Sequence, residues 1–282
     1  MLALVRAYDR TLSMSRRLIS LASGIHDGSP PSLSPPDLIQ VAADAGFNSV
    51  GLWIEPGSNW NHRTTGEVLA KIHRTELTIL DVEVIWLQPG PKPDPKHHRI
   101  IDIGKEIGAK NCLVVSSDPD LENTKLMFED LCRRAEGSDM RVCLEYMWVT
   151  EVKTMDDAME VVQSVGHPLG GILVDPFHHE RVGHAPEKVK EIPDQLLSYC
   201  QLCDVPQRGT ITDEGEYFAD ALDGRLCPGE GALPLKELMS ALPTNLPISL
   251  EIRSQHYRTK YEDPLARAKQ IYKKSLNFLE SL

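Results

Sequence analysis

Short runs of β-branched and apolar residues recur along the chain. They are almost continuously apolar instead of alternating, which is typical of parallel strands covered on both faces. Their spacing of about 30 residues is that of one strand followed by a crossover helix. We expect eight strands, in "LISLASGI", "SVGLWIEP", "LTILDVEVIWL", "NCLVVSSD", "RVCLEYM", "GGILVDPF", "LSYCQLCD" and "PISLEIRS".

Helix signals separate these runs. Ser34 stands before two prolines and "DLIQVAADAG", whose Gly46 is placed to end the helix. Thr154 opens "DDAMEVVQSVG" with a capping-box-like start that uses Asp in place of Glu. Asp263 precedes the last helix, in which apolar residues recur at helical spacing. The chain therefore alternates strands and helices.

Eight strand–helix units over residues 17–282 favour a single-domain α/β fold, a (β/α)8 TIM barrel, with residues 1–16 as an N-terminal extension. A Rossmann fold would need a G-x-G-x-x-G turn after the first strand, and "SGIHDGSPPS" lacks one. The sequence contains no P-loop motif either. An open nucleotide-binding sheet is thus disfavoured.

The bulk composition narrows the classes of function. A formal net charge of −11 disfavours nucleic-acid binding, because phosphate contacts need a basic surface. No apolar run reaches the length of a membrane span, and the N-terminus lacks a secretory apolar region. Six cysteines in 282 residues do not make a disulfide scaffold, so we expect a cytoplasmic protein. Cys200 and Cys203 form a C-x-x-C without a second pair, which favours two small strand residues over a zinc or redox site.

Carboxylates stand at the ends of the last four strands, and in three of them the carboxylate directly follows the apolar run. Glu145 ends the fifth, Asp175 the sixth and Glu251 the eighth, while the seventh contains Gln201 and ends at Asp204. In a TIM barrel these strand ends meet at one mouth. A cluster of like charges there would raise the pKa values or recruit a cation. Such carboxylates can also cap helix N-termini, but their recurrence favours a metal site.

These motifs resemble the xylose isomerase-like barrel superfamily, which includes sugar isomerases and epimerases, inosose dehydratases and hydroxypyruvate isomerase. The likeness extends from about Leu18 to the last helix. It implies that Glu145 and Glu251 bind a metal and also exchange the substrate proton, that Asp175 is a ligand, and that His178 contacts the substrate. The residues that carry the resemblance are Glu145, Asp175-x-x-His178, Gln201-x-x-Asp204 and Glu251.

Gln201 departs from the histidine that many members have as the remaining ligand. Hydroxypyruvate isomerase-like members resemble this chain in having Gln there. An all-oxygen set favours Mn²⁺ or Mg²⁺, with Zn²⁺ or Co²⁺ as alternatives. The other interpretation is a degraded site, which the retained carboxylates disfavour.

The resemblance implies a divalent-metal-dependent isomerase or epimerase of a sugar or keto-polyol. In this hypothesis Glu145 removes a proton, a metal-bound enediolate forms, and Glu251 returns a proton. The alternatives are a lyase that dehydrates an inosose or a dehydroshikimate-like substrate, and a non-catalytic ligand-binding barrel. A DNA-repair barrel would need many strand-end histidines, which the first four strands lack. Relatives are often dimers or tetramers, so a homo-oligomer is compatible with the resemblance.

Four further side chains are candidates for substrate binding. His178 is placed to hold a substrate oxygen, and Arg208 to hold a hydroxyl, carboxylate or phosphate group. Glu83 and Trp86, near the end of the third strand, are expected to line the pocket. A carboxylate substrate would need basic groups, and Arg208 and Arg253 are the candidates. The segment "PGEGALPL" resembles the P-G-x-G loop that follows the seventh strand in these relatives.

Overall fold

Eight parallel strands close into a barrel in the computed structural model, which describes residues 17–25, 33–207 and 212–282. Each strand pairs with the next along the chain, and the last pairs with the first. The prediction of a (β/α)8 barrel is confirmed. The strands are β1 (Ile19–Leu21), β2 (Ser49–Trp53), β3 (Thr78–Leu87), β4 (Asn111–Ser116), β5 (Arg141–Glu145), β6 (Gly170–Val174), β7 (Leu197–Leu202) and β8 (Ile248–Leu250).

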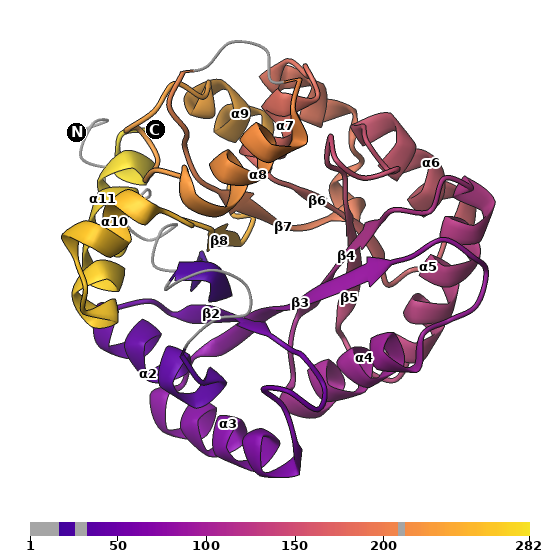
Figure 1. The fold of residues 1–282 in the computed structure, drawn as a ribbon, viewed down its shortest axis with the longest axis horizontal. Coiled ribbons are helices and arrows are strands. Elements are labelled where there is room, and N and C mark those ends of the chain that lie inside the picture. The colour runs from indigo at the N-terminus through magenta and orange to yellow at the C-terminus, as the bar shows by residue number, and fades with distance from the viewer. Residues whose placement is uncertain (1–16, 26–32, 208–211) are drawn as a thin grey trace, which may run out of the picture.

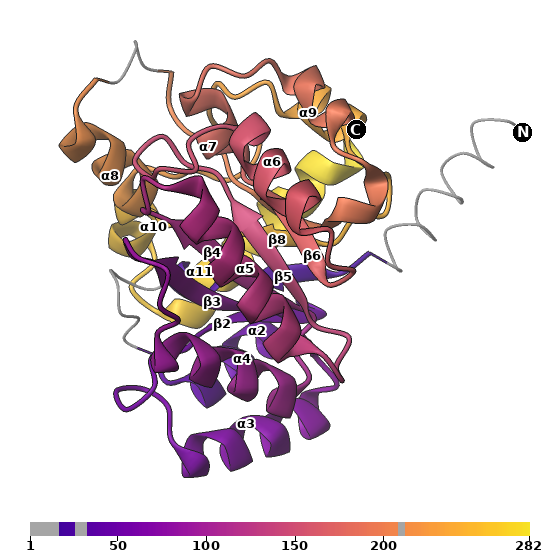
Figure 2. The same cartoon turned by 90° about the vertical axis from the view of Figure 1, so that its right-hand side faces the viewer.

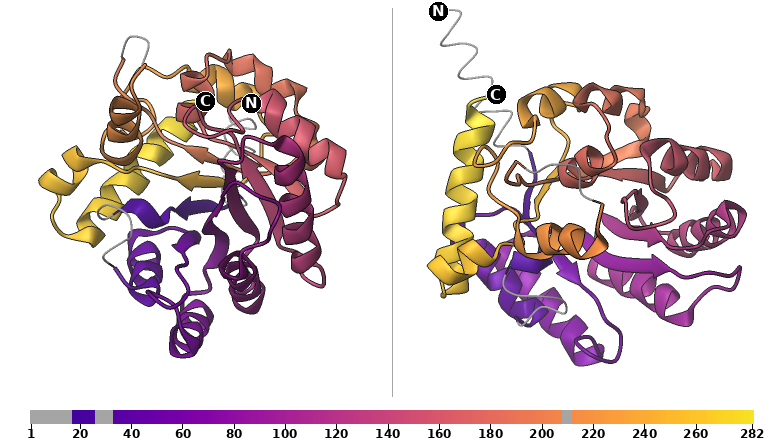
Figure 3. Two further views of the ribbon diagram at one scale, coloured as in Figure 1. Left: turned by 45° about the vertical axis from the view of Figure 1, so that its right-hand side comes forward. Right: turned by 45° about the horizontal axis from the view of Figure 1, so that its top comes forward.

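A ring of helices surrounds the strands (Figure 1). Seen from the side, α3, α4, α5 and α6 stack in chain order along one flank (Figure 2). The last helix, α11, packs against α2 and so closes the ring (Figure 3). The α-helices are α2 (Pro35–Ala45), α3 (His62–Thr75), α4 (Pro95–Ile107), α5 (Leu121–Ala135), α6 (Met155–Val165), α7 (Pro176–Arg181), α8 (Glu214–Asp223), α9 (Leu235–Ala241), α10 (Gln255–Lys260) and α11 (Pro264–Glu280), and the 3-10 helices are η1 (Ser23–Ile25), η2 (Pro186–Glu191) and η3 (Asp194–Leu196).

The helix termini follow the sequence signals. The hydroxyl of Ser34 accepts a hydrogen bond from the backbone of Asp37, and Gly46 ends α2 with a φ of 99°. Thr154 and Asp157 form the reciprocal bonds of a capping box at the start of α6. Helix α3 begins at His62, because the side chain of Asn61 accepts hydrogen bonds from the backbone N–H groups of Arg63 and Thr64 and so caps the helix.

Two hydrophobic layers hold the barrel. The larger lies between the strands and the helices, and a smaller one inside the barrel includes Leu80, Leu113, Leu173 and Tyr199. The predicted extension, residues 1–16, lies outside the described residues. No helix in the described part of the chain is both long and apolar enough to span a membrane.

Candidate metal and catalytic site

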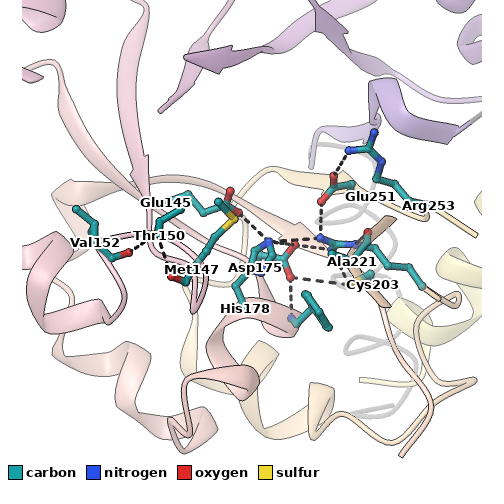
Figure 4. Close-up of polar contacts among 12 residues, drawn as sticks. Glu145, Met147, Thr150, Val152, Asp175, His178, Cys203, Ala221, Glu251 and Arg253 are labelled. Carbon is teal, nitrogen blue, oxygen red and sulfur yellow. Dashed lines mark hydrogen bonds and ion pairs between the residues drawn. The ribbon is translucent and has the colours of Figure 1, made fainter. Parts of the chain in front are cut away.

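The last four strands bring four oxygen-bearing side chains together. Glu145 is the final residue of β5, Asp175 follows β6, Gln201 lies in β7, and Glu251 follows β8. These residues are between 1% and 8% exposed, so they are largely removed from water. Figure 4 shows Glu145, Asp175 and Glu251 directed toward a common centre, together with His178. The structure thus brings together all four residues that were predicted as metal ligands.

The side-chain amide of Gln201 lies among the three carboxylates. With its nitrogen turned toward them, that nitrogen is 2.9 Å from Asp175 Oδ2, 3.0 Å from Glu145 Oε1 and 3.2 Å from Glu251 Oε2. In this orientation the amide donates hydrogen bonds to the carboxylates. With its oxygen turned inward, four oxygens surround the same small volume, which is a ligand set for a hard cation. A glutamine amide can therefore donate hydrogen bonds to the carboxylates without a metal, or offer its oxygen to a metal if one binds.

Arg225 places a buried positive charge in this cluster, and the sequence analysis missed it. Its Nη1 donates to Asp175 Oδ2 at 2.5 Å, and its Nη2 lies 3.0 Å from Glu251 Oε2. Arg225 is 2% exposed, so removal of one partner would leave an uncompensated buried charge. The signal that could have found it is its position three residues before Pro228, at the start of the P-G-x-G loop.

Asp204 holds the loop that follows Arg225. Its carboxylate accepts hydrogen bonds from the backbone of Gly229 and of Leu233, each at 3.0 Å. The second glycine of the motif, Gly231, packs so closely that a Cβ atom there would lie 2.3 Å from Asp204 Oδ1. Only glycine fits this position. The carboxylate of Asp204 therefore anchors the loop, a structural role.

Asp175 caps a helix and also belongs to the charged cluster. Its Oδ1 accepts a hydrogen bond of 2.6 Å from the backbone of Phe177, which makes Asp175 the N-cap of α7. Its Oδ2 faces Arg225 and the other carboxylates. The two roles are compatible because Oδ1 caps the helix while Oδ2 contacts the charged cluster.

His178 joins the cluster from α7. Its Nε2 lies 3.9 Å from Glu145 Oε1 and 4.0 Å from Asp175 Oδ2. Its Nδ1 is hydrogen-bonded to the hydroxyl of Tyr217, and the two rings stack with their centroids 5.7 Å apart. Burial lowers the pKa of His178 to about 3, so the ring is neutral. The sequence did not indicate Tyr217, which lies 39 positions further along the chain.

The pKa values of the three carboxyl groups are shifted in different directions, upward for Glu145 and Glu251 and downward for Asp175. Burial raises the pKa of Glu145 well above its ordinary value, and the charges of Asp175 and Glu251 raise it further. Burial also raises the pKa of Glu251 to about 7, although Arg225 opposes that shift. For Asp175 burial acts in the same direction, but the charge and hydrogen bond of Arg225, together with the backbone hydrogen bond from Phe177, outweigh it and lower the pKa. Neighbouring carboxyl groups with divergent pKa values are typical of acid–base sites.

The cluster fits a divalent metal ion in charge, ligand type and size. Three ionised carboxylates (−3) and the Arg225 guanidinium (+1) leave a formal charge of −2. One candidate ligand atom from each of Glu145, Asp175 and His178 lies within 4.8 Å of the other two, so these three side chains are close enough to reach a single ion. Among the described residues this close group does not include Glu251. The carboxylate and amide oxygens are the ligands that Mg²⁺ and Mn²⁺ prefer.

A cavity of about 220 Å³ adjoins the cluster, and it contains several of the predicted binding residues. Glu83 and Trp86 line it, as expected, and Arg253 lines it as well. The hydroxyl of Ser23 donates a hydrogen bond to Glu83. The remaining predicted binding residue, Arg208, lies outside the described residues. The cavity is therefore bounded by the predicted catalytic residues and by side chains from the first half of the barrel.

The C-x-x-C cysteines are buried thiols. Burial raises the pKa of Cys200 to about 12 and that of Cys203 well above its ordinary value. A thiol of this kind is protonated at neutral pH and is a poor nucleophile or zinc ligand. These properties agree with the interpretation of Cys200 and Cys203 as small residues that fill space.

The model of the family described as "Xylose isomerase-like TIM barrel" matches residues 39–282. The chain belongs to this family. The resemblance inferred from the strand-end residues is therefore confirmed.

Curated relatives of the chain are enzymes of two reaction types. The inosose isomerase of Bacillus velezensis is 27% identical over 144 residues, which cover 48% of this chain and 48% of that protein. The 3-dehydroshikimate dehydratase of Pseudomonas putida is 25% identical over 170 residues, 57% of this chain and 26% of that protein. The chain thus spans a quarter to a half of the length of these relatives.

Solved structures show the same fold at lower identity. The structure titled "IOLI protein with a binding zinc atom" has a TM-score of 0.74 at 14% identity, with 94% of this chain and 98% of that chain covered. D-allulose 3-epimerase from Methylomonas sp., in complex with D-allulose, has a TM-score of 0.69 at 14% identity, covering 94% of this chain and 97% of that chain.

Proposed function

We propose that this protein is a divalent-metal-dependent isomerase or epimerase of a sugar or keto-polyol. The observation that carries the proposal is the convergence of three strand-end carboxylates and the Gln201 amide on one centre with a formal charge of −2. Membership of the family supports an enzyme of this kind. The inosose isomerase among the relatives, and the epimerase among the structural neighbours, support proton transfer as the reaction.

Glu145, Asp175, Gln201 and Glu251 would hold the ion, with Mn²⁺ or Mg²⁺ preferred by their oxygen ligands. A structural neighbour with a bound zinc atom supports a metal-binding role for this cluster. When bound, the ion would polarise the substrate carbonyl and make the adjacent C–H group more acidic. The chain itself must then supply the proton acceptor and the proton donor.

Glu145 and Glu251 are proposed to exchange the proton. Both carboxyl groups line the cavity beside the cluster, where a bound substrate would lie within reach of each. Glu145 would take the proton from the carbon next to the carbonyl, and Glu251 would return one. Return to the opposite face of the same carbon gives an epimer, whereas return to the former carbonyl carbon gives an isomer.

Neighbouring groups are placed to steady the negative charge that develops on the substrate oxygens. Arg225 and His178 line the cavity beside the two glutamates. The bond from Tyr217 fixes the orientation of the His178 ring, and Asp175 fixes one end of the Arg225 guanidinium. Donors held in place before the reaction lower the barrier more than mobile ones do.

Dehydration is the second candidate reaction. It is favoured by the dehydratase among the curated relatives and by the presence of Arg225 and Arg253 in the cavity, since both could face a substrate carboxylate. Glu145 would remove the proton next to the carbonyl, and the hydroxyl group on the following carbon would leave with a proton as water. The C–H and C–O bonds break, and a C=C bond conjugated with the carbonyl forms.

One experiment separates these reactions. The Mn²⁺-loaded protein is incubated in D₂O with ketoses, inososes and 3-dehydroshikimate, and each reaction is followed by mass spectrometry and ultraviolet absorbance. Isomerisation or epimerisation adds one deuterium without an absorbing product, whereas dehydration produces a conjugated chromophore. Absence of both signals across the panel, in protein shown to bind Mn²⁺, would contradict the proposal.

A further inference from the structure

The cavity beside the carboxylate cluster has one apolar face. Five of its lining residues belong to a single hydrophobic cluster inside the barrel. These residues, here called the apolar wall, are Val84, Trp86, Leu113, Val115 and Met147.

Strands β3 and β4 position most of this wall. Trp86 and Val115 are partners in the strand register, so their side chains lie next to each other on the inner face. Val84 and Trp86 are only half-buried, which leaves part of each side chain accessible from the cavity. The indole N–H of Trp86 already donates to Ser117 Oγ at 2.7 Å. Among the described residues the wall therefore has no free side-chain donor for a substrate hydroxyl.

Helix α8 adds a second apolar surface to the same cavity. Phe218 and Leu222 lie one helical turn apart, line the cavity and are half-buried. The polar lining groups are instead those of the carboxylate cluster, Glu83, Tyr217, the arginines and the indole N–H group of Trp53. The cavity is therefore two-sided, with a charged side and an apolar side.

On the basis of the proposed function, we infer that the substrate is an amphipathic derivative of a sugar or keto-polyol, one that carries an apolar substituent. One end is a carbonyl with an adjacent hydroxyl, which the charged side takes, and the other end is an alkyl or aryl group against the apolar wall. A polyhydroxylated free sugar would place hydroxyls against this wall, where they would lose water without gaining a partner. Each such hydroxyl is expected to reduce affinity about 10-fold. An apolar group there instead gains affinity from the surface it removes from water.

Three small α-hydroxyketones test the inference. Hydroxyacetone, 2-hydroxyacetophenone and 1,3-dihydroxyacetone share the HOCH₂–CO– head, and their remaining groups are methyl, phenyl and hydroxymethyl. Their dissociation constants are measured by isothermal titration calorimetry on the Mn²⁺-loaded protein. We expect the phenyl compound to bind at least about 10-fold more tightly than the methyl compound, and the hydroxymethyl compound to bind most weakly.

A pair of variants ties the preference to the cavity. Leu222→Asn changes an apolar lining residue of α8, and Leu126→Asn makes the same change on α5, where the side chain is 57% exposed. Leu222→Asn should reduce several-fold the ratio of the dissociation constants of the methyl and phenyl compounds. Leu126→Asn should leave this ratio unchanged. An unchanged preference in Leu222→Asn would overturn the role assigned to this surface.

The outcomes distinguish the inference from the function on which it rests. Tighter binding of 1,3-dihydroxyacetone than of 2-hydroxyacetophenone would overturn the amphipathic substrate and leave the proposed function standing. Failure of all three ketones to bind to protein that holds Mn²⁺ would overturn the proposed function, and the inference with it.

Discussion

The two halves of the barrel share one backbone plan but present different side chains at the same mouth. Strands β5–β8 end in Glu145, Asp175 and Glu251, with Gln201 inside β7. Strands β3 and β4 contribute an apolar wall instead. The comparison shows that the same barrel backbone can carry different side chains at its strand ends. Function in such folds depends on those strand-end residues and not on the backbone.

The first half also contains a buried carboxylate, but of a different kind. Asp81 of β3 is fully buried, with the side chain of Ser249 beside its carboxyl group. Its side chain fits because its strand partner is Gly51, where a Cβ atom would lie 2.9 Å from either oxygen. Burial raises the pKa of Asp81 well above its ordinary value, and Glu83 and Glu251 add to the shift. We infer that Asp81 is protonated in the folded protein, unlike Asp175.

The largest expected effect concerns the two glutamates of the second half. With a substrate that exchanges deuterium, Glu145→Gln should lower both exchange and conversion about 10²–10⁴-fold, because the proposed base is lost. Glu251→Gln should lower conversion by a similar factor but retain exchange at the first carbon. Mass spectrometry of substrate and product measures both rates. Each variant must first be shown to bind Mn²⁺.

The control for these variants lies in the first half of the chain. Glu67→Gln makes the same chemical change at the surface of α3, where the side chain is 48% exposed. It should keep both rates. If Glu145→Gln also kept both, the division between a catalytic and a non-catalytic half of the barrel would be wrong.

A smaller effect is expected on stability when Arg225 is replaced. Arg225→Met leaves Asp175 and Glu251 buried without their cation, so the free energy of unfolding of the metal-free protein should fall by about 3–5 kcal/mol. Urea unfolding measures this loss, and added Mn²⁺ should recover part of it. Arg63→Met, at a side chain that is 87% exposed, is the matched control and should change stability little. Equal stabilities for the two variants would show that the buried pairing contributes nothing.

The smallest effect concerns Asp81 and depends on pH. Because the folded state raises its pKa, the stability that Asp81 contributes is fully present below about pH 4 and is lost as the pH rises. Asn does not titrate, so the Asp81→Asn variant does not lose this stability as the pH rises. The free energy of unfolding of the variant minus that of the parent protein should therefore increase from pH 5 to pH 8. The slope is at most about 1.4 kcal/mol per pH unit. Urea unfolding at three pH values tests this, and a constant difference would mean that Asp81 is ionised when folded.

The fold and the metal-site candidates could be predicted from the sequence because their signals are local. Buried parallel strands are continuously apolar, and Ser34 and Thr154 mark the starts of two helices as predicted. Glu145, Asp175 and Glu251 stand where an apolar strand ends, so the barrel geometry alone brings them together. Their roles as ligands and bases remain predictions.

The parts that escaped prediction depend on long-range contacts. Arg225 lies beyond the strand ends, and the loop that follows it is held by hydrogen bonds to Asp204. The sequence instead indicated Arg208 as the substrate-binding arginine. Tyr217 meets His178 only when α8 packs over the mouth. In the sequence, Leu113 and Val115 look like any other buried strand residues. The residues next to them do not indicate that the two side chains line a cavity.

The most direct test of the central claim is a crystal structure of the protein soaked in Mn²⁺, with the metal located by its anomalous scattering. The account predicts one peak about 2.0–2.6 Å from oxygens of Glu145, Asp175, Gln201 and Glu251. A map without a peak at this centre at saturating Mn²⁺, with Arg225 still bridging Asp175 and Glu251, would contradict it.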